Sequence, residues 1–220
     1  MELIQNIAVA ILPPLYVIYF IYKNDLYEKE PHKLLIKTFI VGCFVVVPAL
    51  VLELIFDGDF FNNVFLHAMI GVSLAEEGSK FIFLRYYNYK KDDFNEPYDG
   101  IVYAVVISMG FALVENIFYV LGNTGIEMSV GFLRMFTAIP LHATCGVIMG
   151  YYMGITKMNE AKLFPQLSAI FLPVLIHGLY DYFIFAGLGI IYSLLIVAIA
   201  FYFSNKAIKI HQSNSPFKTS

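Results

Sequence analysis

The chain has 220 residues, of which 59% are hydrophobic and 14% charged, and its mean hydropathy is +0.71. Soluble domains average about half apolar and a quarter charged residues, so this composition excludes an ordinary soluble fold. The net charge of −3 and the lack of a long basic cluster leave no electrostatic basis for binding nucleic acid. The expected surroundings of this protein are therefore a lipid bilayer.

Apolar stretches of about 20 residues, the length that crosses a hydrocarbon core, occur seven times along the chain. We predict membrane-spanning helices over residues 3–22, 35–56, 64–86, 98–121, 130–155, 166–186 and 188–204. The predicted fold is all-α, a polytopic transmembrane bundle of about seven helices with no separate soluble domain.

Basic residues are distributed unequally between the two ends of the predicted helices. Twelve of the 14 Lys and Arg residues fall on one side, which the positive-inside rule places in the cytoplasm. The opposite side carries Asp57, Asp59 and Glu127 and no basic residue. We therefore expect an external N-terminus and a cytoplasmic C-terminus. The transmembrane domain is expected over residues 1–205, followed by a polar cytoplasmic tail over 206–220.

Smaller features of the spans indicate packing rather than chemistry. Cys43 and Cys145 both lie in apolar spans and are interpreted as small buried residues, not as a disulfide or a metal pair. Gly146, Gly150 and Gly154 recur every four residues, which is typical of a helix face that approaches its neighbour closely. Glu53 and His67 fall near the outer ends of their spans and are interpreted as interfacial.

The third predicted span has the sequence LAEEGSK over residues 74–80, close to its centre. A charge near the middle of a bilayer costs about 2.5–3.5 kcal/mol on insertion scales, so such residues indicate function. Lys80 lies one helical turn from both Glu76 and Glu77, and we expect it to pair with one while the other faces a pocket. The unpaired acid would suit general acid–base catalysis. The structural alternative is a buried ion pair that sets how the helices pack.

Glu115 and Asn116 lie inside the fourth predicted span. They belong either to a functional site or to a polar contact between helices. Phe111 lies one turn before Glu115 and would form the wall of the same face. Its alternative role is simple core packing.

The fifth and sixth spans contribute histidines. His142 taken alone is equally compatible with a structural role, whereas His177 and Asp181 stand at i and i+4 on one helix face. Asp181 can then hold one ring nitrogen and leave the other free as a base or a ligand. Four helices thus carry polar groups at overlapping depth, at Glu76, Glu115, His142 and His177, which predicts a pocket between spans three and six.

At these residues the chain resembles the PrsW family of intramembrane proteases, which is distantly similar to the CAAX prenyl and bacteriocin-processing proteases. The matching motifs are Glu76-Glu77-x-x-Lys80, Asp99-Gly100-Ile101-Val102-Tyr103, Gly110-Phe111-Ala112-x-x-Glu115-Asn116 and His177-Gly178-x-Tyr180-Asp181, with Glu30-Pro31 and His142. The resemblance implies a protease of the bacterial cell membrane. It would make the first (site-1) cut in a single-pass anti-sigma factor, leading to sigma-factor release and a stress response.

We assign roles to these residues as hypotheses. Glu76 or Glu77 activates the attacking water, and His177, oriented by Asp181, transfers protons. His142 or Asn116 stabilises the oxyanion. Lys80, Phe111, Glu115 and Asn116 support the site, with Glu115 binding water or metal.

The sequence is compatible with both a metal-dependent and a metal-free mechanism. The family is often classed as metalloproteases, and Glu115, His142 and His177 could supply a three-ligand zinc site. The HExxH signature is absent, and two spare acids favour a glutamate-activated water without metal. The alternative function is a small proton-coupled transporter or channel that uses the same buried acids as a relay.

Overall fold

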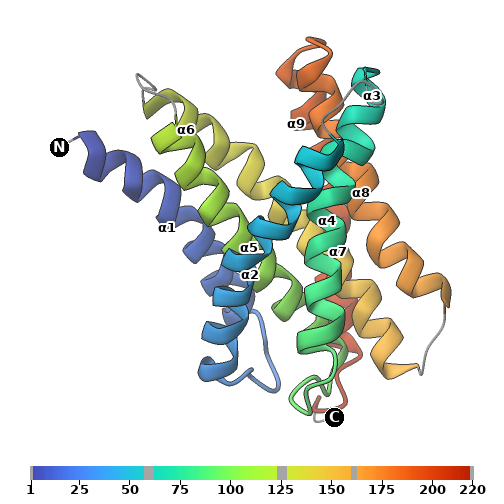
Figure 1. Cartoon of the computed structure of the whole chain (residues 1–220). Coiled ribbons are helices and arrows are strands. Elements are labelled where there is room, and N and C mark those ends of the chain that lie inside the picture. Colours follow the sequence, from blue (N-terminus) through green and yellow to red (C-terminus); the bar gives the residue numbers. More distant parts are fainter. Residues whose placement is uncertain (1, 57–61, 123–127, 160–162, 219–220) are drawn as a thin grey trace.

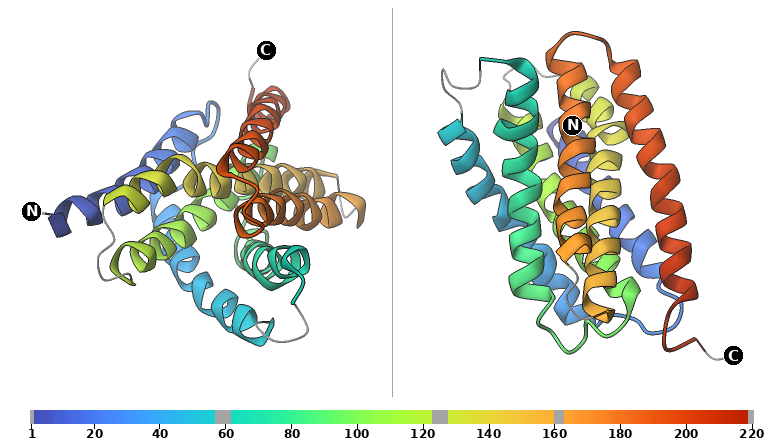
Figure 2. Two further views of the ribbon diagram at one scale, coloured as in Figure 1. Left: turned by 90° about the horizontal axis from the view of Figure 1, so that it is seen from above. Right: turned by 90° about the vertical axis from the view of Figure 1, so that its right-hand side faces the viewer.

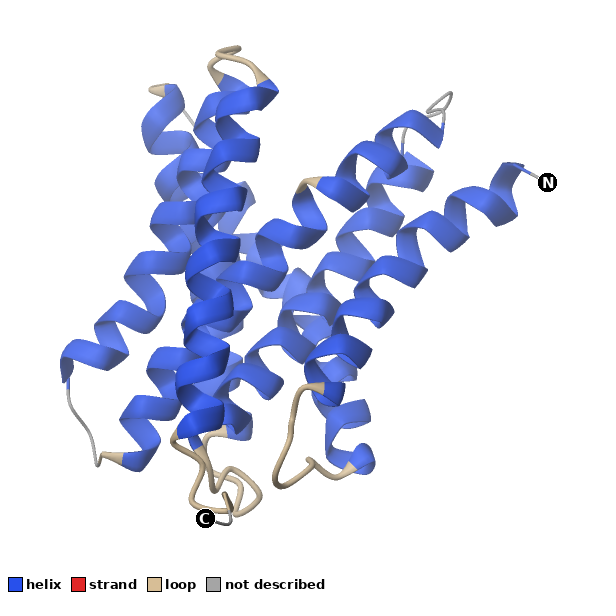
Figure 3. Cartoon of the chain, turned by 180° about the vertical axis from the view of Figure 1, so that it is seen from behind, coloured by secondary structure: helices blue, strands red, loops and turns tan. Residues whose placement is uncertain are grey.

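The computed structural model describes residues 2–56, 62–122, 128–159 and 163–218, and the regular structure in these ranges is helical throughout (Figures 1 and 3). The helices are α1 (Glu2–Lys23), α2 (His32–Phe56), α3 (Val64–Leu66), η2 (His67–Leu74), α4 (Ala75–Phe83), η3 (Leu84–Asn88), α5 (Pro97–Gly122), α6 (Met128–Phe136), α7 (Ala138–Met158), α8 (Leu163–Phe185) and α9 (Ile190–Ser213). The prediction of an all-helical bundle is confirmed.

Five helical segments in the described ranges are long and apolar enough to cross a membrane: His32–Phe56, Pro97–Val120, Gly131–Met158, Leu163–Phe185 and Ile190–Ser213. Helix α1 and the continuous run α3–η2–α4–η3 complete the seven predicted segments. The two termini lie at opposite ends of the bundle (Figure 1), as an odd number of crossings requires. Sidedness stays a prediction, and four residues used for it, Asp57, Asp59, Glu127 and Lys162, lie outside the described residues.

One predicted span is interrupted and one predicted boundary is wrong. The fifth span, 130–155, corresponds to Gly131–Met158, but the backbone leaves helical geometry at Thr137 (φ −120°, ψ −69°) between α6 and α7. The last helix does not end at Ser204 but continues to Ser213, so the first part of the expected tail, 206–213, is helical. Packing explains the extension, because His211 is buried and its Nε2 donates to the backbone carbonyl of Tyr151 at 2.9 Å.

Helix α5 forms the centre of the bundle, where it packs chiefly against α7, α2 and α1 (Figure 2). Its residues are buried without interruption from Pro97 to Ala112. The outer helices instead expose large apolar side chains, such as Leu54 and Ile191, as expected for contact with lipid. The protein is thus a multi-pass membrane protein whose central helix α5 is largely shielded from the bilayer.

Glycines allow α5 and α7 to approach closely, as the spacing of Gly146, Gly150 and Gly154 predicts. A Cβ atom at Gly150 would collide with the backbone of Gly100, and one at Gly154 would collide with the carbonyl of Pro97. Because both obstacles are backbone atoms, neither can move aside without separating the helices. This close crossing brings the polar residues of α5 and α7 within hydrogen-bonding range of each other.

The segment 64–88 is not a regular α-helix. Its residues His67–Leu74 and Leu84–Asn88 are π-helical, and the α-helical turns of α4 lie between them. Ser73, in the first π-helical stretch, donates to the carbonyls of Met69 (2.9 Å) and of Val174 on α8 (3.0 Å). Wide turns of this kind occur often at functional sites, and this one directly precedes Glu76.

Candidate active site

The centre of the site is a buried cluster on α4. Nζ of Lys80 donates to Oε2 of Glu76 at 3.2 Å and to Oε1 of Glu77 at 2.8 Å. The same ammonium lies 3.9 Å from the ring centroid of Phe111 on α5, a cation–π contact. Lys80 and Glu77 are fully buried, and Glu76 is 5% exposed. The expectation that Lys80 pairs with only one acid is wrong, because the i+3 and i+4 spacings bring both carboxylates to the same ammonium.

His142 connects α4 to α5. Its Nδ1 lies 3.0 Å from Nζ of Lys80, and its Nε2 lies 2.9 Å from Oε2 of Glu115. An ammonium can only donate and a carboxylate can only accept, so the neutral ring carries its proton on Nε2. Both nitrogens of His142 are therefore engaged, which leaves no free N–H for an oxyanion.

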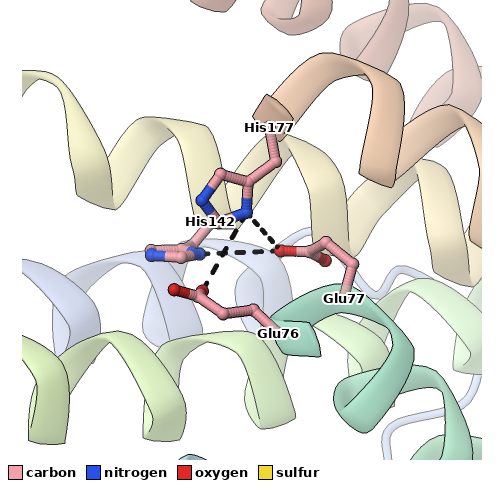
Figure 4. A group of neighbouring side chains, drawn as sticks. All are labelled: Glu76, Glu77, His142 and His177. Carbon is pink, nitrogen blue, oxygen red and sulfur yellow. Dashed lines mark hydrogen bonds and ion pairs between the residues drawn. The ribbon is translucent and has the colours of Figure 1, made fainter. Parts of the chain in front are cut away.

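His177 on α8 lies between two acids. Its Nδ1 donates to Oε1 of Glu77 at 2.9 Å, and its Nε2 lies 3.2 Å from Oδ2 of Asp181. Figure 4 shows Glu76, Glu77, His142 and His177 pointing toward one another from α4, α7 and α8. The predicted contact with Asp181 is confirmed, but the second ring nitrogen is not free, because Glu77 occupies it.

Arg134 on α6 lies within the predicted span 130–155, and the sequence analysis gave it no role in the site. Its guanidinium contacts Oε1 of Glu115 at 2.8 Å and Oδ1 of Asn116 at 2.7 Å, and it stacks over the ring of Tyr119 at 3.8 Å. A charged residue inside an apolar span was the available signal for it. Asn116 is thus bonded to Arg134 and is not among the residues that line the cavity.

A cavity of about 530 Å³ lies beside this network. Its polar wall consists of Glu53, Glu76, Glu115, Arg134, His142, His177 and Asp181, and Phe111 contributes to its apolar wall. The predicted pocket between spans three and six is confirmed, with additional walls from α2 and from the turn that leads into α9. Glu53, interpreted above as interfacial, lies in this wall. Glu77 and Lys80 stand behind the wall, out of the cavity.

The donor chemistry of the cluster suits a metal ion. Ligand atoms from Glu76, Glu77, His142 and His177 all lie within 4.8 Å of one another, and Oε2 of Glu77 is buried without a hydrogen-bond partner. Imidazole and carboxylate donors in this combination are typical of catalytic zinc. This group contains His142 and His177 of the predicted metal set but not Glu115, whose carboxylate contacts Arg134 and Nε2 of His142.

The site contains more carboxylates than basic side chains. Two basic side chains, Lys80 and Arg134, face five carboxylates, those of Glu53, Glu76, Glu77, Glu115 and Asp181. A divalent cation or bound protons would offset the excess of three negative charges. Buried acids and imidazoles at the wall of a cavity inside a polytopic helix bundle are the constellation of a membrane-embedded hydrolase.

Comparison with known proteins identifies the kind of hydrolase. The model of the PrsW family of intramembrane metalloproteases matches residues 30–204, and the chain belongs to this family. It is 39% identical over 178 residues to Protease PrsW of Halalkalibacterium halodurans, covering 80% of this chain and 81% of that protein. It is 31% identical over 192 residues to Protease PrsW of Bacillus subtilis, covering 86% of this chain and 87% of that protein.

A third relative, Protease PrsW of Clostridioides difficile, is 33% identical over 183 residues, covering 79% of this chain and 76% of that protein. No solved structure matches the chain. The chain is thus a protease of the bacterial plasma membrane, and the description of its family as metalloproteases favours the metal-dependent alternative for its site.

Proposed function

We propose that this protease makes the first (site-1) cut in a single-pass, membrane-anchored anti-sigma factor, on the outer side of the membrane. The cut would start the release of the sigma factor and so a stress response. The proposal is supported by membership of the PrsW family and by the cavity, which brings an acid–base pair to a lipid-embedded wall.

The observation that carries the catalytic proposal is the different position of the two glutamates. Glu76 lines the cavity, whereas Glu77 lies behind it and is bonded to both Lys80 and His177. We assign Glu76 as the base that takes a proton from the attacking water. Glu77 then positions Lys80 and His177.

His177 and Arg134 supply the remaining roles. His177 faces the cavity between Glu77 and Asp181, so it can pass a proton to the leaving amine. Arg134 also lines the cavity, where its Nη2 is paired with Glu115 and its Nε donates to Asn116, and its planar guanidinium carries further N–H donors. We assign the stabilisation of the oxyanion to Arg134, because both nitrogens of His142 are already engaged.

Glu77, His142 and His177 would hold a metal ion. Such an ion lowers the pKa of bound water and polarises the scissile carbonyl. In this structure Nζ of Lys80 contacts Oε1 of Glu77 and Nδ1 of His142. Lys80 would lose these two contacts if both atoms bound a metal ion. The roles of Glu76 and Asp181 are the same in either case.

The test is cleavage in proteoliposomes by the purified full chain. The substrate is a single-pass protein with an extracytoplasmic domain, and mass spectrometry maps the products. We expect one cut on the extracytoplasmic side, abolished in Glu76→Gln and retained in the exposed-loop control Asp92→Asn. Proton flux through the same vesicles without any cleavage would support the transporter alternative and overturn the proposal.

A further inference from the structure

A second acidic cluster lies away from the cavity, where the α1–α2 loop meets the start of α5 (lower end in Figure 1). Ligand oxygens of Glu28, Glu30 and Asp99 lie within 4.8 Å of one another. Asp25 and Glu96 are buried beside them, each at 1% exposure. Five carboxylates from two loops and one helix thus share a small volume at the end of the bundle.

The protein holds two of these carboxylates by one oxygen each and gives the other oxygen no hydrogen bond from outside the acidic cluster. Oδ2 of Asp99 accepts hydrogen bonds from the backbone N–H groups of Asn95 and Glu96, both at 2.7 Å. Oε2 of Glu30 accepts a hydrogen bond from the hydroxyl of Tyr103. Oδ1 of Asp99 and Oε1 of Glu30 are buried and receive no hydrogen bond from a donor outside the acidic cluster. This is how ligating carboxylates are oriented by the groups around a metal site.

Little positive charge lies near the cluster in the described residues. No ion pair in the described ranges joins its carboxylates to a basic side chain, and Lys29, whose charge acts on Asp25, donates to the carbonyl of Tyr22 at 2.9 Å instead. Oε2 of Glu28 is buried without a hydrogen-bond partner. Buried charges without a counter-ion are expensive, so this cluster needs either a cation or protons.

Protons are the competing occupant, because carboxyl groups that are buried beside one another ionise less readily than exposed ones.

We propose that Glu28, Glu30 and Asp99 bind a hard divalent cation, Mg²⁺ or Ca²⁺, at a site separate from the catalytic cavity. Oxygen-only ligands select these ions over zinc, which is bound by nitrogen and sulfur as well. Oxygens up to 4.8 Å apart match opposite ligands around Ca²⁺, whose bonds are about 2.3–2.6 Å long. Mg²⁺ requires a slightly tighter arrangement of the same ligands.

The cation would tie the α1–α2 loop to the base of α5. Glu28 and Glu30 directly precede α2, the helix whose Val46 and Leu50 form one wall of the catalytic cavity. Binding at the cluster would therefore fix where α2 begins relative to the central helix. The expected effect is on stability, since a ligand that binds only the folded state raises its free energy of unfolding.

The experiment is a thermal-unfolding titration of the purified full chain in detergent, followed with a dye that reacts with the buried thiol of Cys145. MgCl₂ and CaCl₂ are added in separate arms, each against NaCl at equal ionic strength. We expect one or both divalent salts to raise Tm by several degrees, about 1 kcal/mol or more of stabilisation. The arm with the larger shift at lower concentration identifies the ion.

Variants separate this site from the rest of the protein. Asp99→Asn should lose most of the shift, and so should Glu28→Gln, which is half-buried and keeps the core intact. The shift should be unchanged in Asp92→Asn, an exposed acid of the neighbouring loop, and in Glu76→Gln, which alters the catalytic cavity. A Tm independent of both divalent ions, or an equal shift in Glu28→Gln, would overturn the proposal and leave protons as the occupant.

Discussion

Nζ of Lys80 on α4 lies 3.0 Å from Nδ1 of His142 on α7, inside the bundle. Both side chains are almost fully buried. This contact links the ion pairs of Lys80 on α4 to α7. Nε2 of His142 in turn contacts Glu115 on α5. Lys80 therefore organises the site across three helices rather than neutralising a single acid.

Replacing Lys80 by methionine should destabilise the fold as well as abolish cleavage. It would leave Glu76 and Glu77 buried without their cation, and breaking a buried pair in this way costs about 3–5 kcal/mol. The measurement is thermal unfolding in detergent together with substrate cleavage. The exposed Lys90→Met serves as control and should change neither. A Lys80→Met variant with unchanged Tm would mean that the acids are neutralised in another way.

Glu76→Gln and Glu77→Gln should both cripple cleavage but differ in stability. Loss of a general base lowers the rate about 10²–10⁴-fold, which we expect for Glu76→Gln with little change in Tm. Glu77→Gln should also lower Tm, because Glu77 is fully buried and bonded to Lys80 and His177. Substrate cleavage and thermal unfolding are measured on both variants. If both cleave normally, the paired acids are structural.

Metal analysis of active, detergent-purified protein should find about one zinc-type ion per chain. Activity and metal should disappear together on treatment with a strong chelator, because the chelator removes the ion that would activate the attacking water. His177→Ala should lower both metal content and rate. Glu115→Gln is the matched variant. It should keep the metal if Glu77, His142 and His177 are the ligands, and lose it if Glu115 is one. Full activity with no metal would assign water activation to Glu76 alone.

Reporter fusions test which end of the bundle faces the cytoplasm. Fusions after Lys91 and after Lys209 should report the cytoplasm, since twelve of the 14 basic residues lie on that side. A fusion at Asn123, which lies outside the described residues, should report the exterior. An external signal at Lys91 would reverse the orientation. It would also move the acidic cluster at Glu28, Glu30 and Asp99 to the outside, where Ca²⁺ is the more plausible ion.

The sequence by itself determined the class of fold and most members of the site. Apolar runs long enough to cross a bilayer predict seven helices, because a buried backbone in lipid must bond within its own segment. Charged residues inside those runs predict the site, because inserting a charge into a bilayer costs free energy and such residues are usually functional. Contacts set by helical spacing, such as Lys80 with Glu76 and His177 with Asp181, follow from the chain alone.

The tertiary structure decided how these residues are shared out between helices. Three features of the site depend on how the helices rotate and cross. His177 contacts Glu77 as well as Asp181, Arg134 pairs with Glu115, and Glu76 faces the cavity. The cluster of Glu28, Glu30 and Asp99 joins residues some 70 positions apart in the chain. Helical periodicity specifies which residues share a face but not which neighbour that face meets. Close backbone contacts such as Gly100 with Gly150 make that choice.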